Sequence, residues 1–129
     1  MLPIVFGGFI DSVIRDKPQA VKRNRDMVVA VARDQLDLLL SPYVLTVEYE
    51  VGEDGRYYGS FEEIDIVGEG ETLEELKLSL ANDVIEYAQE FWEDIDRYRH
   101  APNRKAHYPI VFRIMLQDSP EGVLKFIRA

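Results

Sequence analysis

Four carboxylates in the middle of the 129-residue sequence have the residue type and spacing that metal-dependent phosphodiester cleavage uses. Glu48 and Glu50 alternate along one predicted strand, while Glu62 and Asp65 belong to the next two. Carboxylates on neighbouring strands can bind Mg²⁺, which activates water for attack. The same alternation is typical of the solvent face of a half-exposed sheet, and we favour that interpretation. A metal-dependent nuclease or other hydrolase is kept as an alternative function.

The two histidines, His100 and His107, are seven positions apart in a predicted basic connector, residues 99–109. Together they could hold a metal ion or exchange protons, but we favour a place on the loop surface. The sequence has no cysteine, which excludes disulfides, thiolate metal sites and thiol catalysis. We therefore predict no catalytic residue, no bound metal and no cofactor.

The stretch 68–76 opens the longest predicted helix. Thr72 and Glu75 have capping-box spacing: the Thr72 hydroxyl accepts from the Glu75 N–H, and the Glu75 carboxylate returns to the Thr72 N–H. Apolar residues then recur every three or four positions, which predicts one helix of about seven turns ending at residue 98. They are Leu73, Leu76, Leu80, Val84, Ala88, Phe91, Ile95 and Tyr98. The preceding glycines lack the third glycine of a dinucleotide loop, and Glu69 and Glu71 would repel phosphate.

The first 42 residues are harder to interpret. Residues 1–14 fit a strand or a short helix interrupted at Gly7 and Gly8, and residues 22–25 are interpreted as a linker. Met27 begins a cleaner pattern, and whether it is the natural start stays open. Residues 28–32 are rich in β-branched valine, which predicts a short strand. Asp34 is the expected N-cap of a helix that ends at residues 41–42.

Strands are predicted at residues 43–51, 56–62, 64–67 and 110–116, with a hairpin turn at 52–55 and a short C-terminal helix at 119–127 that begins with Ser119 as N-cap. Gly59 within the second strand indicates a bulge or a close backbone approach. The fold class is therefore α+β. We expect a basic N-terminal extension or tail at 1–26 and a single domain at 27–129 with an N-terminal strand–helix extension.

Charge is distributed unevenly along the chain. Residues 1–26 carry a formal charge of +2, residues 27–96 carry −16, and residues 97–129 carry +5. An acidic surface repels nucleic-acid phosphates and attracts basic proteins. Because no apolar run approaches the ~18 residues of a membrane span and no basic segment precedes the apolar N-terminus, we expect a cytoplasmic protein with no membrane partner.

Residues 44–95 resemble the HicB-like antitoxin domain. The resemblance is carried by the strand and turn at 47–60, by the segment 62–67, and by the G-x-G-x-T-x-E-E-hydrophobic run at 68–76. It implies a partial ribonuclease-H-like β-β-β-α-β core without the ribonuclease carboxylates. It also implies an antitoxin of a type II toxin–antitoxin pair, a small basic RNA-cleaving toxin as partner, and dimers or higher homo-oligomers.

We predict that this protein neutralises its toxin through an acidic surface, with toxin-binding residues Glu86, Glu90, Glu93 and Asp94 on the long helix. Only residues 119–129 follow the last predicted strand, too few for the ribbon-helix-helix or helix-turn-helix that family members carry. Operator DNA therefore stays an open partner, with Lys22, Arg23 and Arg25 as the contacting residues. A stand-alone oligomeric domain that binds a ligand or another protein is the remaining alternative.

Overall fold

The chain folds into two compact units, Met1–Ser41 and Pro42–Ala129. The structure is a computed structural model that describes the backbone of residues 2–129 and the side chains of residues 7–129. This described part contains six helices of α type and six strands in two sheets, which confirms the predicted α+β class. None of the helices within residues 2–129 is long and apolar enough to cross a membrane.

The N-terminal unit begins with a helix, α1 (Leu2–Arg15), that runs through Gly7 and Gly8. A hairpin of β1 (Gln19–Arg23) and β2 (Asp26–Ala30) follows, with Arg23 opposite Asp26. Asn24 supplies the positive φ of 56° that the turn needs, a conformation that asparagine tolerates better than most residues. The linker predicted at residues 22–25 is therefore wrong, and the boundary expected before Met27 falls inside this hairpin.

The unit ends with α2 (Arg33–Leu40). Its N-cap is Ala32, which has no side-chain acceptor, and Asp34 lies in the first turn instead. The Asp34 carboxylate accepts from the Gln35 N–H at 2.9 Å, so its role as N-cap was predicted wrongly. Ser41 is the C-cap, which confirms the predicted end of this helix.

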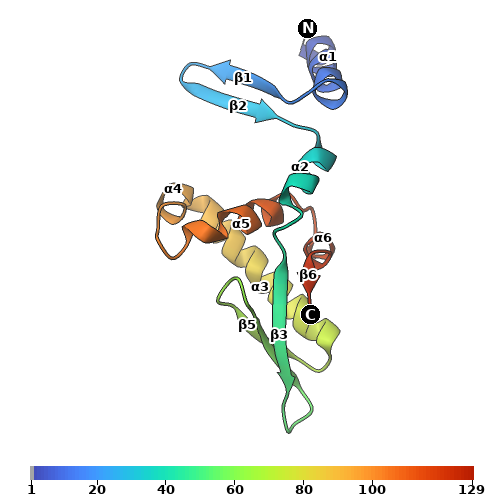
Figure 1. Cartoon of the computed structure of the whole chain (residues 1–129), viewed down its shortest axis with the longest axis vertical. Coiled ribbons are helices and arrows are strands. Elements are labelled where there is room, and N and C mark those ends of the chain that lie inside the picture. Colours follow the sequence, from blue (N-terminus) through green and yellow to red (C-terminus); the bar gives the residue numbers. More distant parts are fainter. Residues whose placement is uncertain (1) are drawn as a thin grey trace. The chain divides into compact units, whose positions relative to one another are not determined.

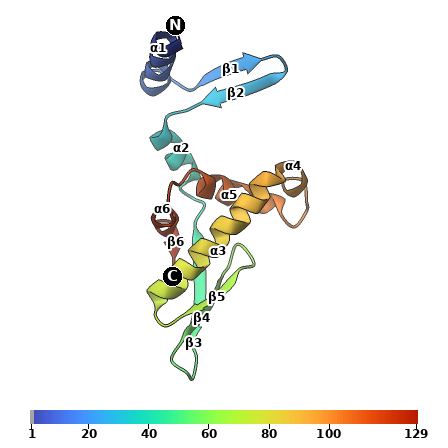
Figure 2. The same ribbon diagram turned by 180° about the vertical axis from the view of Figure 1, so that it is seen from behind.

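The C-terminal unit contains a four-stranded sheet in the order β5-β4-β3-β6. β3 (Leu45–Val51) and β4 (Tyr57–Phe61) form the predicted hairpin, β5 (Val67–Gly70) pairs antiparallel with β4, and β6 (Ile127–Arg128) pairs parallel with β3. Helix α3 (Leu73–Glu93) covers one face of the sheet (Figures 1 and 2). Leu45, Val47 and Phe61 are buried with it in the core, and the opposite face is open.

Glycines let α3 approach the sheet closely. A Cβ on Gly59 would lie 2.9 Å from Leu76 Cδ2, and one on Gly68 would lie 3.1 Å from Leu80 Cδ2. The close approach predicted at Gly59 is thus confirmed. The predicted third strand at 64–67 is wrong, because the strand begins at Val67 and continues to Gly70. Glycine has low strand propensity, but here pairing with β4 and contact with the helix decide the conformation.

The N-terminus of α3 is capped nearly as predicted. The Thr72 hydroxyl accepts from the Glu75 N–H at 3.1 Å, whereas the Glu75 carboxylate accepts from the Glu71 N–H at 2.8 Å rather than from Thr72. The predicted apolar stripe is buried from Leu76 to Phe91. The prediction of a single helix to residue 98 is wrong, because Asp94 adopts non-helical angles (φ −124°, ψ 50°) and separates α3 from α4 (Ile95–Tyr98).

The strand predicted at 110–116 is a helix, α5 (Tyr108–Met115), entered through a 3₁₀ turn at Lys105–His107. Its buried residues are Ile110, Val111 and Ile114, a helical spacing that β-branched composition concealed. After α6 (Pro120–Leu124), with Ser119 as N-cap, residue Ile127 lies in β6 and not in the predicted helix. The fourth strand of the β-β-β-α-β core is therefore β6.

Candidate functional site

Negative charge is concentrated in the C-terminal unit. Residues 42–129 hold nineteen acidic and nine basic side chains, a formal charge of −10, whereas residues 1–41 have a formal charge of +1. Part of this negative charge lies on two exposed surfaces of this unit: one side of α3 and the open face of the sheet. Neither surface is a closed pocket, so both suit contact with a macromolecule better than enclosure of a small substrate.

The first surface is the α3 stripe, formed by Glu86, Glu90 and Glu93. These residues are four and three positions apart, so they share one side of the helix, and all three are exposed. None of the ion pairs found within the described residues involves them. Asp94 differs, because it terminates α3 and its carboxylate lies 3.7 Å from the Arg97 guanidinium. The structure thus brings three of the four predicted residues into one stripe and places the fourth at its end.

A groove of about 310 Å³ lies between α3, α5 and α6. Asn82 and Gln89 of α3 line it on one side, and Met115 of α5 lines it on the other. Asn82 and Gln89 lie one turn before and after Glu86, so the groove borders the α3 stripe. The sequence did not reveal this groove, because residues 110–116 were predicted to be a strand. The spacing of Ile110, Val111 and Ile114 fits one face of a helix, and this pattern could have identified α5, which forms one wall of the groove.

The second surface is the open sheet face. Glu48 and Glu50 of β3 point away from α3, because their neighbour Val47 is buried beneath it and strand side chains alternate. The Glu62 carboxyl, when protonated, donates a hydrogen bond to the Glu48 carboxylate; this bond, followed by burial, raises the pKa of Glu62 above its usual value. A shallow depression of about 650 Å³ extends from Glu48 and Glu50 across β4 to Val67.

The structure does not bring the four carboxylates Glu48, Glu50, Glu62 and Asp65 together as one cluster of metal ligands. Within the described residues, no three acidic or histidine side chains are grouped closely enough to hold a metal ion. Glu62 approaches Glu48, whereas Asp65 is exposed in the segment between β4 and β5. The face therefore has carboxyl groups at close range, an arrangement that favours a positively charged partner.

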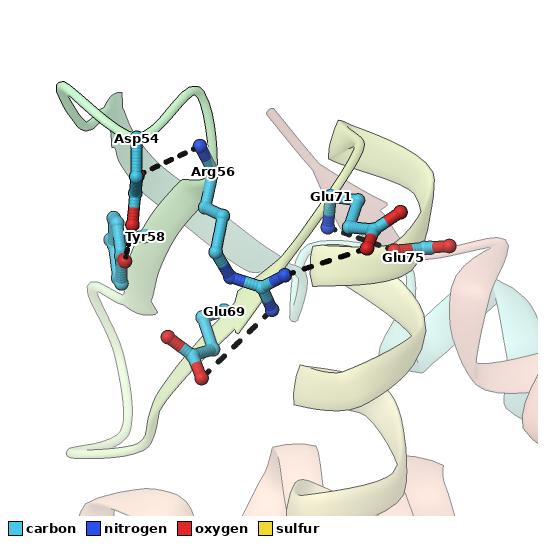
Figure 3. A network of polar contacts seen from close by, with 6 residues as sticks. All are labelled: Asp54, Arg56, Tyr58, Glu69, Glu71 and Glu75. Atoms are coloured by element: carbon cyan, nitrogen blue, oxygen red, sulfur yellow. Dashed lines mark hydrogen bonds and ion pairs between the residues drawn. The ribbon is translucent and has the colours of Figure 1, made fainter.

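A polar network surrounds Arg56, the residue just before β4, and pairs it with the carboxylates of Glu69 and Glu71 (Figure 3). Arg56 is the only basic residue between positions 42 and 76, and it lies 3.9 Å from Glu69 and 3.8 Å from Glu71. The Tyr58 hydroxyl donates to Asp54 at 2.5 Å, and this bond lowers the pKa of Asp54. Arg56 is engaged there, and none of the ion pairs found among the described residues includes Glu48, Glu50 or Glu62.

The N-terminal unit carries the predicted nucleic-acid-binding residues at one end of its hairpin. Lys22 and Arg23 end β1, and Arg25 lies in the turn; all three are exposed. The structure therefore brings them together at the tip of a two-stranded ribbon. The same hairpin exposes apolar side chains, with Met27, Val28 and Val29 between 60% and 64% exposed.

The two histidines do not form a site. His100 is exposed, while His107 Nδ1 lies 2.6 Å from the Tyr87 hydroxyl. Burial, and then the positive charge of Arg104, lowers the pKa of His107. Arg104 also lies over the Tyr87 ring at 5.3 Å. These contacts pack the 3₁₀ turn against α3, which is a structural role.

Comparison with known proteins identifies the function class. Residues 4–129 match a family described as PHD-like, antitoxin of toxin–antitoxin, RelE/RelB systems. A crystal structure from Syntrophomonas wolfei subsp. wolfei, described as an antitoxin part of a proposed toxin/antitoxin system, has 37% sequence identity to the chain. The two structures align over 99% of this chain and 92% of the Syntrophomonas chain, with a TM-score of 0.81. No curated protein sequence matches the chain.

Both descriptions are of antitoxins, which confirms the predicted function class and its toxin partner. An antitoxin acts by binding and not by catalysis, so the hydrolase alternative for Glu48, Glu50, Glu62 and Asp65 is not supported. The match spans nearly the whole sequence, from the first helix to the last residue. The chain therefore belongs to the PHD-like family of antitoxins of RelE/RelB toxin–antitoxin systems.

Proposed function

We propose that this antitoxin neutralises a small basic RNA-cleaving toxin through the α3 stripe and the adjacent Asp94. The observation that carries the proposal is the stripe itself: Glu86, Glu90 and Glu93 are exposed, aligned and outside the ion pairs of the described residues. An RNA-cleaving toxin needs positive charge to hold phosphates. A partner that covers this charge with carboxylates blocks the RNA-binding surface and is guided to it electrostatically.

The groove beside the stripe supports this location. An interface needs an apolar centre with a polar rim, because charged contacts at the rim mainly set specificity and association rate. Met115 in the groove is 38% exposed, and Trp92, next to Glu93, is 37% exposed. Methionine and tryptophan are enriched at such interfaces, so apolar contact area and negative charge occur on neighbouring parts of one surface.

Co-expression with the small protein encoded by the adjacent gene tests the proposal. We expect the two proteins to purify as a complex whose association rate falls with added salt. Changing Glu86 and Glu90 to Gln should lower the association rate by about tenfold at low salt. The matched control changes Asp11 and Asp26 to Asn, two exposed carboxylates of the N-terminal unit, and should leave the rate unchanged. Equal effects of the two variants would refute the α3 location, and absence of any complex would refute the pairing.

We also propose that the protein is a homo-oligomer assembled through its N-terminal unit. A unit of 41 residues is too small to bury an adequate core alone, and an isolated two-stranded hairpin is marginally stable. The exposed Met27, Val28 and Val29 support this proposal. Light scattering should give at least a dimer mass, and Val28→Lys should shift it toward the monomer, whereas Val67→Lys in the other sheet should not.

Operator DNA is a second proposed partner, because Lys22, Arg23 and Arg25 gather at the tip of the hairpin. A two-stranded ribbon fits the major groove of DNA. A DNA fragment from upstream of the gene should bind with a steep salt dependence. Changing the three residues to Ala should weaken binding and reduce the slope of log K against log salt by roughly 0.9 for each lost phosphate contact. An unchanged slope would remove these residues from the interface.

We further propose that residues 42–129 form a HicB-like domain and that the protein is cytoplasmic. The strand order β5-β4-β3-β6, with β6 parallel to β3, and the capped α3 support a HicB-like, partial ribonuclease-H-like domain in residues 42–129. A cytoplasmic location follows from the RNA substrate of the proposed toxin. Fluorescence microscopy of a tagged chain with its native N-terminus would contradict this location if the signal followed the cell envelope.

A further inference from the structure

One edge of the sheet is incompletely paired. β6 pairs only with Leu45 and Thr46 of β3, although β3 continues to Val51. Figure 1 shows β3 extending past β6 toward the hairpin turn. Over residues 47–51, β3 pairs with β4 on one side, and within residues 2–129 no strand continues β6 on the other. An unpaired edge of this kind is a template for another strand.

The backbone hydrogen-bonding groups of this edge can be assigned from their neighbours. Leu45 N–H donates to the Phe126 carbonyl on the β6 side, and the Thr46 carbonyl accepts from Glu62 N–H on the β4 side. Because these directions alternate along a strand, Glu48 and Glu50 bond to β4. Tyr49 and Val51 therefore direct both N–H and C=O toward the unpaired side.

The side chains of the edge also alternate in character. Tyr49 and Val51 are 45% and 54% exposed, on the same side of the sheet as the buried Val47. Glu48 and Glu50 are exposed on the opposite side, where the depression begins. A strand that paired here would place alternate side chains beside apolar surface and beside carboxylates.

Charge decides which strand fits. Edge-to-edge pairing of two copies of β3 would bring Glu48 and Glu50 of each copy together, and like charges on paired strands are destabilising. The closeness of Glu48 to Glu62 already places negative charge on this face. A strand with basic residues on one side and apolar residues on the other would meet opposite charge and apolar surface together.

We propose that an extended segment of the toxin, with basic and apolar residues alternating, adds as a strand to residues 47–51 of β3. This inference rests on the proposed function and adds a second contact element to the α3 stripe. Main-chain bonds to Tyr49 and Val51 would supply affinity, and Glu48 and Glu50 would select the basic segment.

Hydrogen exchange on the complex with the adjacent gene product tests this inference residue by residue. The amides of Tyr49 and Val51 should exchange fast in the free protein and become protected at least about tenfold in the complex. Those of Glu48 and Glu50 are bonded to β4 in both states and are internal controls. A complex in which the Tyr49 and Val51 amides exchange as before would overturn the inference and leave the proposed function standing. Absence of a complex would overturn both.

A pair of variants gives an independent test. Val51→Lys places a charge beside the apolar side chains of the added strand, where it would lose its hydration, and should weaken the complex by about tenfold. Leu78→Lys changes an exposed residue of α3 (43% exposed) outside the stripe and should have less than a threefold effect. NMR spectra of both free variants establish that the fold is intact. Equal affinities for Val51→Lys and the parent protein would count against strand addition.

Discussion

The carboxyl group of Glu62 shares a hydrogen bond with the carboxylate of Glu48 across β3 and the end of β4. Both side chains are exposed on the open face of the sheet. Two carboxylates this close cannot both ionise without repulsion, so the pKa of Glu62 is raised. The pair is a local cost to the folded protein that a basic partner would relieve.

This pair predicts how stability depends on pH. A carboxyl group with a raised folded-state pKa stabilises the protein below its unfolded pKa, and this contribution is lost as pH rises through the folded-state value. Glu48→Gln should therefore raise the free energy of unfolding at pH 7, and the gain should disappear near pH 3, where the carboxyls are protonated. Urea unfolding at both pH values measures the effect. A gain of equal size at both pH values would show that its cause is not electrostatic.

Capping of α3 predicts a measurable loss of stability. The Thr72 hydroxyl accepts from the Glu75 N–H, which would otherwise lack a partner at the helix N-terminus. Thr72→Ala should lower the free energy of unfolding by about 1 kcal/mol. Thr72→Ser, which keeps the hydroxyl, is the control and should retain most of the parent protein's free energy of unfolding. Equal losses for both variants would assign the effect to the methyl group of threonine.

Packing of α3 on the sheet predicts that Gly59 tolerates no side chain. A Cβ at this position would lie 2.7 Å from the Glu48 carbonyl oxygen and 2.9 Å from Leu76 Cδ2. Gly59→Ala should therefore lower the free energy of unfolding by roughly 1–3 kcal/mol. Gly8→Ala is the control, because nothing lies within 4 Å of its added Cβ, and in the helix it should stabilise by about 0.5–1 kcal/mol.

The sequence predicted what depended on local patterns. Thr72 with Glu75 identified the start of α3, and the alternation from Leu45 to Val51 identified β3. The acidic residues Glu86, Glu90 and Glu93 were assigned correctly to an exposed side of the helix, because the 3.6-residue period determines which residues share a side. Their role in binding the toxin stays a prediction.

What the sequence did not reveal depends on tertiary contacts. Ile110, Val111 and Ile114 favour a strand by composition, but the segment is a helix whose Phe112 ring packs 5.8 Å from Trp92. The short β6 forms only beside β3, since two residues carry almost no local signal. The unpaired edge at Tyr49 and Val51 could not be predicted either, because it depends on where a distant strand ends.

The contact between His107 and Tyr87 predicts a second pH effect, opposite in sign to that of Glu62. The hydroxyl of Tyr87 lies 2.6 Å from His107 Nδ1, and burial together with Arg104 lowers the pKa of the imidazole below its usual value of 6.5. A histidine with a depressed folded-state pKa stabilises the protein above its unfolded pKa. This contribution is lost as pH falls through the folded-state value, because protonation then favours the unfolded chain.

His107→Gln should therefore reduce the loss of stability between pH 7.5 and pH 5, compared with the parent protein. Carboxylates titrate in both proteins, so the informative quantity is the difference between the two pH dependences of the unfolding free energy. His100→Gln is the matched control, because His100 is exposed in the connector after α4, and it should follow the parent protein. NMR titration of the two imidazoles provides the direct measurement. If the His107 ring titrated at or above the usual histidine value, the buried contact with Tyr87 would not hold it neutral.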